Sequence, residues 1–120
     1  MESKRFAITL NRDNPRAMYL KRVENLKMLY ESGLAEHLAD NFPGTTIIVF
    51  GSHAFGEDTI DSDIDIAVIG ARREEINLVS FEKRLERKIS LHFYNDFNSI
   101  QKHLKENLCN GIILTGGIQL

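Results

Sequence analysis

The stretch Phe50–Ile69 reads FGSHAFGEDTIDSDIDIAVI, and it decides how the rest of the chain is interpreted. An apolar, β-branched segment at 45–50 runs into this stretch and stops at Gly51-Ser52, and a second apolar segment follows Asp63. Segments of this composition, bounded by glycine or polar residues, are typical of buried strands. We therefore expect two strands, at 45–50 and 64–69, joined by a turn and a polar loop.

Two aspartates at the start of the second strand are the first candidate site residues. Because strand side chains alternate between faces, Asp63 and Asp65 should point the same way, while Ile64 and Ile66 point into the core. Two carboxylates so close together repel each other unless a cation neutralises them. Mg²⁺ commonly takes one or two carboxylates together with substrate phosphates and water. The sequence therefore predicts that Asp63 and Asp65 bind Mg²⁺.

The Gly51-Ser52 turn is the second candidate. A strand that ends there and continues into a short helical turn at 53–55 aims backbone N–H groups outward, and such a turn suits phosphate oxygens. Glycine lets the backbone approach a phosphate closely, and the Ser52 hydroxyl can donate one more hydrogen bond. A phosphate site beside a metal site on neighbouring strand ends indicates phosphoryl or nucleotidyl transfer.

The N-terminal third is predicted to be helical. Asn14 as a cap and Pro15 at the first helical position indicate a helix start, and Gly33 is placed to end that helix. We interpret its apolar stripe as a packing face, part of which can contact a partner; the stripe consists of Tyr19, Val23, Leu26 and Tyr30. A shorter helix should follow at 34–42. Residues 6–10 are expected to form a short strand or an extended arm.

Beyond the second strand, the pattern predicts a helix at 72–87, a third strand at 88–94, a helix at 96–108 and a short closing strand at 112–115. Interleaved strands and helices indicate an α/β (α+β) fold, with helices packed against a small mixed sheet. The length of 120 residues suits one domain, which we expect to span residues 1–120.

Composition narrows the class of protein further. The net charge of −2 argues against a general nucleic-acid binder. Cys109 is the single cysteine, which excludes an intrachain disulfide and fits the reducing cytoplasm; we expect its side chain to be buried. No run approaches the roughly 18 apolar residues of a membrane span, and no secretory signal is visible at the N-terminus. We expect a cytoplasmic protein without a membrane partner.

The spacing Gly-Ser, ten residues, Asp-x-Asp resembles the signature of the DNA polymerase β superfamily, in particular its minimal nucleotidyltransferases from archaea and bacteria. The likeness is strongest over Ile47–Gly70. It implies a polymerase-β-like fold and transfer of a nucleoside monophosphate, AMP from ATP, to a hydroxyl acceptor. It also implies that Gly51 and Ser52 hold the triphosphate, and that Asp63 and Asp65 bind two Mg²⁺ ions.

The third strand departs from that family pattern. Members usually carry a third carboxylate there, which bridges the catalytic metal and can take the acceptor's proton. In KISLHFY (88–94), Ser90 or His92 stands in its place. His92 is a candidate catalytic residue, because imidazole can ligate a metal or accept a proton near neutral pH. Mg²⁺, however, prefers oxygen ligands.

Two functions therefore remain open. The first is an Mg²⁺-dependent enzyme, for which the resemblance implies a helical HEPN-type toxin as one acceptor; a small molecule or RNA are others. The second is a nucleotide-binding, antitoxin-like or regulatory module with weak or no turnover. An oligomer is compatible with both.

Overall fold

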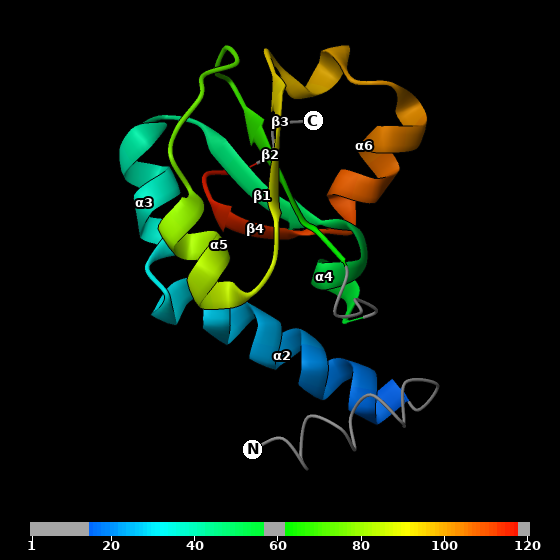
Figure 1. Ribbon diagram of the computed structural model, residues 1–120. Coiled ribbons are helices and arrows are strands. Elements are labelled where there is room, and N and C mark those ends of the chain that lie inside the picture. Colours follow the sequence, from blue (N-terminus) through cyan, green and yellow to red (C-terminus); the bar gives the residue numbers. More distant parts are fainter. Residues whose placement is uncertain (1–14, 57–61, 118–120) are drawn as a thin grey trace.

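The computed structural model describes residues 15–56 and 62–117, apart from the side chains of residues 53 and 55 (Figure 1). The strand or arm expected at 6–10 and the Asn14 cap lie outside the described residues. Within them, one four-stranded mixed sheet has the order β3-β2-β1-β4. Its strands are β1 (Thr46–Phe50), β2 (Ile64–Ile69), β3 (Ile89–Tyr94) and β4 (Ile112–Thr115).

The directions of the strands bring three of them to one end of the sheet. β1 runs antiparallel to both β2 and β4, and β3 runs parallel to β2. The end of β1 therefore meets the beginnings of β2 and β3. The register pairs Phe50 with Asp65, and Asp65 in turn with Ser90. The small mixed sheet predicted from the sequence is confirmed.

Helices cover both faces of the sheet (Figure 1). One face packs against α2 (Pro15–Glu31), α3 (Leu34–Asn41) and α5 (Val79–Leu85), with Leu29, Leu34, Leu38 and Leu85 buried on the sheet's isoleucines and valines. The other face packs against the 3-10 turn η1 (Phe97–Ser99) and α6 (Lys102–Cys109). None of the described helices is long and apolar enough to cross a membrane.

Strand β2 contributes to the hydrophobic clusters on both faces of the sheet, and Asp65 lies on one of these faces. Ile64, Ile66 and Val68 are fully buried against α3 and its neighbours. Asp65 has the opposite parity and shares its face with Ala67, which packs toward α6. Burying each branched side chain contributes about 1.5–3 kcal/mol, so the apolar face fixes the strand and leaves Asp65 half-exposed on the other side.

Two predicted helices are shorter than expected. The helix predicted at 72–87 is α5, Val79–Leu85, because the Asn77 side chain accepts a hydrogen bond from the Val79 N–H and favours a turn before it. The helix predicted at 96–108 is divided into η1 and α6. There the Asp96 carboxylate accepts a hydrogen bond from the Asn98 N–H, and Ile100 adopts an extended conformation.

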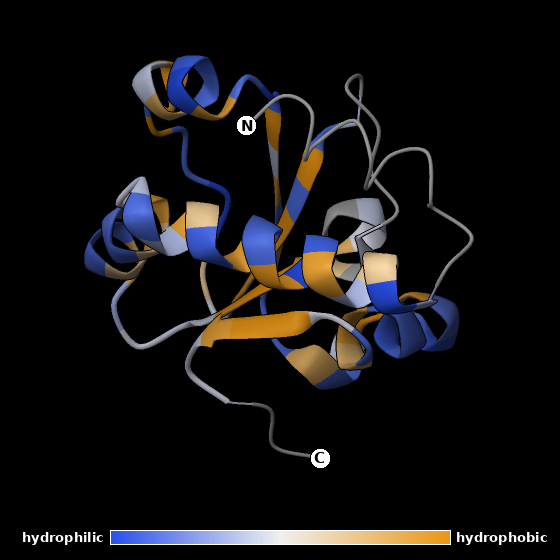
Figure 2. Ribbon diagram, turned by 90° about the horizontal axis from the view of Figure 1, so that it is seen from below, coloured by the Kyte–Doolittle hydropathy of each residue, from blue (hydrophilic) through white to orange (hydrophobic). Residues whose placement is uncertain are grey.

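The packing face predicted for α2 is wrong. Tyr19, Val23 and Tyr30 are 63%, 65% and 52% exposed, while the buried residues of α2 are Asn25 and Leu29. Figure 2 shows α2 crossing the front of the molecule with hydrophobic segments on its ribbon. The helical period is right, but the side of α2 that is buried is the one with Asn25 and Leu29, and Tyr30 of the stripe contacts the sheet through its hydroxyl, which donates a hydrogen bond to the Leu114 carbonyl at 3.3 Å. Cys109, which we expected to be buried, is also exposed.

Candidate functional site

The predicted phosphate turn and one predicted metal ligand lie against each other. β1 ends at Phe50, and the short helix α4 (Gly51–Phe55) begins at the next residue, with Gly51 at a φ of +74°. A Cβ atom at Gly51 would lie 2.9 Å from Asp65 Oδ2. Any side chain there would force the carboxylate to move, so glycine is required both by its conformation and by the carboxylate beside it.

Helix α4 is held in place by α2. The Arg22 Nε donates a hydrogen bond to the Ala54 carbonyl at 3.0 Å, and the Ala54 side chain is buried. At the end of α4, Gly56 approaches so closely that a Cβ atom would lie 2.7 Å from the Met18 carbonyl. Sequence reasoning missed Arg22, because its partner lies 32 residues away and no local pattern indicates the contact.

The structure also brings His92 to Asp65. The His92 Nε2 lies 3.3 Å from Asp65 Oδ1, and the two side chains are 38% and 34% exposed. The imidazole ring and the Phe50 ring make a T-shaped contact, with centroids 5.4 Å apart. Ser90 is the register partner of Asp65 on the parallel strand. A carboxylate, a hydroxyl and an imidazole therefore share one face where β2 and β3 begin.

Asp63 lies one residue before β2 and is exposed. Its parity matches that of Asp65, so its place beside Asp65 stays a prediction from strand alternation. Across 15–56 and 62–117, no three His, Cys, Asp or Glu side chains form a cluster ready to hold a metal ion. The donors fit Mg²⁺ in another way, since this ion typically takes one or two carboxylates and completes its shell with phosphates and water.

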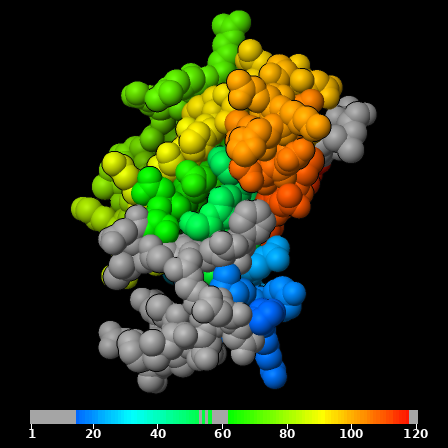
Figure 3. All heavy atoms as spheres, turned by 90° about the vertical axis from the view of Figure 1, so that its right-hand side faces the viewer, coloured from blue at the N-terminus to red at the C-terminus, as the bar shows by residue number. Residues whose placement is uncertain are grey.

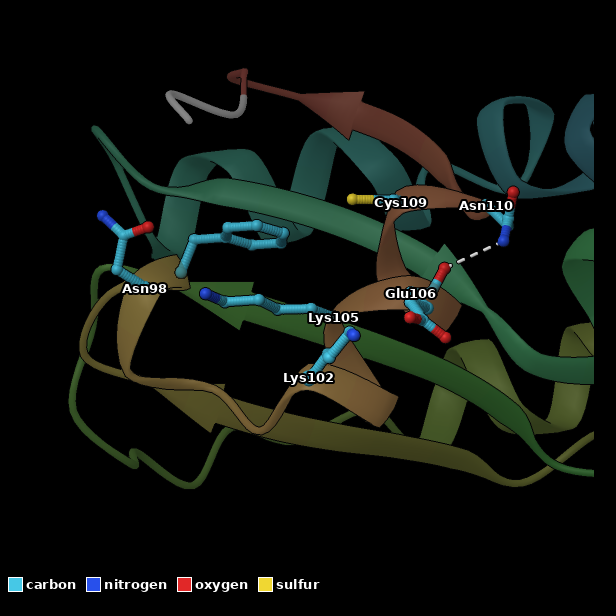
Figure 4. A pocket seen from close by; sticks show the side chains of 7 residues that line it. Asn98, Lys102, Lys105, Glu106, Cys109 and Asn110 are labelled. Atoms are coloured by element: carbon cyan, nitrogen blue, oxygen red, sulfur yellow. Dashed lines mark hydrogen bonds between the residues drawn. The ribbon is translucent and has the colours of Figure 1, made fainter.

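Two hollows lie elsewhere on the described surface. One, of about 400 Å³, lies along α6, where Figure 4 shows Lys102, Lys105 and Glu106 around it. The other, of about 820 Å³, lies near Thr46 and Gly70, at the end of the sheet away from Gly51 and Asp65. Figure 3 shows the atoms of η1 and α6, in orange, gathered on the upper part of one face of the molecule. Neither hollow is lined by a predicted site residue.

The fold and the contact of Gly51 with Asp65 define a mixed α/β domain in which a glycine turn at the end of β1 lies beside a carboxylate on β2. Residues 31–114 match the family model of the nucleotidyltransferase domain, and the chain therefore belongs to this family, as a minimal nucleotidyltransferase of the polymerase β superfamily. The matched range includes β1, β2 and β3 entirely, and β4 except for its last residue, Thr115. Neither the curated proteins nor the solved structures include a significant match to the chain.

Proposed function

We propose that this nucleotidyltransferase domain moves AMP from ATP to a hydroxyl acceptor in an Mg²⁺-dependent reaction. The observation that carries the proposal is the approach of Gly51 to Asp65, where a Cβ atom would lie 2.9 Å from Oδ2. A carboxylate so close to the Gly51-Ser52 turn can hold a cation that also contacts the phosphates bound there. Family membership supports nucleotidyl transfer in general.

In this proposal, Gly51 and Ser52 hold the triphosphate tail, while Asp63 and Asp65 are the carboxylate ligands. Bound Mg²⁺ supplies charge stabilisation on the phosphate oxygens. The acceptor hydroxyl gives up its proton to a nearby base or to water as its oxygen forms a bond to the α-phosphorus, the bond from that phosphorus to the oxygen bridging to the β-phosphate breaks, and pyrophosphate leaves. His92 stands beside Asp65, where a proton acceptor or a further ligand is needed.

We propose a protein as the acceptor, with a helical HEPN-type partner in the cytoplasm as the leading candidate. The apolar stripe of α2 supports a protein partner, because Tyr19, Val23 and Tyr30 are exposed and, with the partly buried Leu26, repeat at the four-three-four spacing with which helices pair. The same helix contacts α4 through Arg22. A partner on α2 would therefore lie next to the helix that follows the phosphate turn.

Transfer of labelled AMP tests the enzyme directly. The chain is incubated with Mg²⁺ and ATP labelled at the α-phosphate, with and without the product of the neighbouring gene. We expect label on the partner, and we expect the double variant Asp63→Asn, Asp65→Asn to abolish it. The control is Asp40→Asn, which makes the same chemical change at an exposed position on α3. Equal labelling by the double variant and the control would refute the assigned site.

The composition of β3 favours a second candidate, a nucleotide-binding module with little or no turnover. Strand β3, Ile89–Tyr94, carries no carboxylate, and Ser90 is paired with Asp65 where a third acid would complete the set. Tight, metal-dependent ATP binding without label transfer to the partner or to the chain itself would identify this function. The assay above therefore separates the two.

A further inference from the structure

We propose that His92 Nε2 and Asp65 Oδ1 ligate one divalent ion, and that this donor pair favours a first-row transition ion over Mg²⁺. The proposal rests on the proposed function, in which Asp65 also serves the phosphates bound at the Gly51-Ser52 turn. It assigns His92 a role as a metal ligand rather than as a proton acceptor.

The spacing of the two donor atoms allows both to bind the same ion. Neighbouring ligands of an octahedral ion with bonds of about 2.1 Å lie roughly 3.0 Å apart. The Nε2 and Oδ1 atoms are 3.3 Å apart, so both can bind one ion after a shift of a few tenths of an ångström. As an N–H···O hydrogen bond the same distance is long, since such bonds cluster near 2.9–3.0 Å.

The two oxygens of the Asp65 carboxylate face different neighbours. Oδ2 lies toward Gly51, where a Cβ atom would be 2.9 Å away, and Oδ1 lies toward His92. One carboxylate can therefore serve the phosphate turn through Oδ2 and the imidazole side through Oδ1. The ion proposed beside His92 is therefore at a different position from an ion held at the phosphates.

His92 is positioned well enough to act as a ligand. Its strand neighbours Leu91 and Phe93 pack into the core on the far face of the sheet, and its ring makes a T-shaped contact with the Phe50 ring. Little side-chain freedom is then left to lose when an ion binds. At 38% exposure the ring still has access to ions from solvent.

The chemistry of the donors decides which ion is favoured. Carboxylates and water suit Mg²⁺, whereas imidazole suits later divalent ions, and affinity for a mixed nitrogen and oxygen site rises from Mn²⁺ along the first transition row. A histidine at position 92, where an acid would otherwise stand, therefore lowers the preference of the site for Mg²⁺. Mn²⁺, the weakest binder of that row, is a conservative probe.

The experiment uses Mn²⁺ alone, followed by electron paramagnetic resonance on protein labelled with ¹⁵N-histidine. We expect a ¹⁵N hyperfine coupling to bound Mn²⁺ in the native chain, in the absence of nucleotide. The coupling should disappear in His92→Gln and in Asp65→Asn, and Mn²⁺ affinity should fall about tenfold or more. His103→Gln is the matched control, because His103 is an exposed histidine on α6. It should keep both the coupling and the affinity.

A second variant tests the selectivity itself. His92→Asp should shift the ratio of Mn²⁺ to Mg²⁺ dissociation constants at least tenfold toward Mg²⁺, with circular dichroism verifying that the variant is folded. Mn²⁺ bound without nitrogen coupling, no Mn²⁺ binding, or an unchanged ratio in folded His92→Asp would each overturn the role of His92. None of these results would remove AMP transfer that depends on Asp63 and Asp65, so failure here is distinguishable from failure of the proposed function.

Discussion

Arg22 on α2 and Ala54 on α4 are joined by a hydrogen bond of 3.0 Å from the guanidinium Nε to the main-chain carbonyl. The bond matters because α4 has five residues, and a helix of that length is not stable on its own. Its orientation depends on Arg22, on the buried Ala54 side chain and on the tight approach of Gly56 to Met18. The geometry of the phosphate turn therefore depends partly on α2.

Replacement of Arg22 should weaken nucleotide binding together with stability. Arg22→Ala removes a partly buried, charge-assisted hydrogen bond, and we expect a loss of about 1–2 kcal/mol in the free energy of unfolding. KM for ATP should rise more than kcat falls, because the residue positions the turn and does not contact the reacting atoms. Urea denaturation and steady-state kinetics measure both effects.

Lys27→Ala is the control for Arg22→Ala. Lys27 is an exposed residue of the same helix, paired with Glu31 at 3.8 Å, and its loss should change stability by less than about 1 kcal/mol. An Arg22→Ala variant that behaves like Lys27→Ala in both measurements would show that α4 does not depend on the bond.

Gly51 and Gly44 provide a matched pair for testing the contact with Asp65. Both have a positive φ, of +74° and +76°, so an alanine at either position should cost about 1–2 kcal/mol in backbone strain. Around Gly44 no atom lies within 4 Å of an added Cβ, whereas at Gly51 the Asp65 carboxylate must rotate away. Gly51→Ala should therefore abolish metal-dependent nucleotide binding at a stability close to that of Gly44→Ala.

Calorimetry with ATP and a divalent ion, alongside urea denaturation, measures that difference. Retained nucleotide affinity in a folded Gly51→Ala variant would contradict the importance of the Asp65 position. Lost affinity in Gly44→Ala would show that strain alone, away from the site, produces the effect.

The exposed stripe of α2 predicts a variant that separates partner binding from folding. Val23→Glu places a charge at a position that is 65% exposed, and stability should change by no more than about 0.5 kcal/mol. AMP transfer to a protein partner should be lost, while nucleotide binding is kept. Leu29→Ala, in the buried side of the same helix, should instead cost about 2–5 kcal/mol. Full transfer by Val23→Glu would remove α2 as the partner surface.

The partly buried Tyr94 side chain should make the stability of the protein depend on pH in the alkaline range. Burial raises the pKa of its phenol above the usual 10.0, because desolvation disfavours the phenolate. A group with a raised folded-state pKa contributes stability below its unfolded pKa and loses that contribution as the pH rises through the folded pKa. We expect the native chain to lose stability above pH about 10 more steeply than Tyr94→Phe.

Ultraviolet absorbance of phenolate, followed during a pH titration, measures the same group directly. One phenolate step of the native chain should be absent from Tyr94→Phe. That step should lie at a higher pH than tyrosine titration in the unfolded chain. A Tyr94 step at or below its position in the unfolded chain would contradict the assigned burial.

The sequence was most informative where the pattern is local. Ile64, Ile66 and Val68 alternate with polar or small residues, and this alternation predicts both the bounds of β2 and the opposite orientation of Asp65. The glycine turn follows from one residue type at one strand end. Such features depend on neighbouring residues in the chain, so a single sequence contains them.

Features that depend on distant partners were missed or misassigned. The stripe that contains Tyr19 and Val23 has helical period, but which side of α2 meets the core depends on α3 and α4. The bond from Arg22 to Ala54 joins residues 32 positions apart, and no local pattern indicates it. His92 was expected near the aspartates only through the family resemblance, and its distance from Asp65 follows from the register of β2 and β3, which composition does not specify.

Nuclear magnetic resonance mapping shows directly whether nucleotide binds at the Gly51-Ser52 turn beside Asp65. A non-hydrolysable ATP analogue is titrated into ¹⁵N-labelled chain with Mg²⁺, and backbone amide shifts are followed. We expect the largest shifts at Gly51, Ser52 and Asp65, and their loss in Asp65→Asn. Shifts centred on the α6 hollow around Lys102 and Lys105, or shifts unchanged by Asp65→Asn, would contradict this expectation.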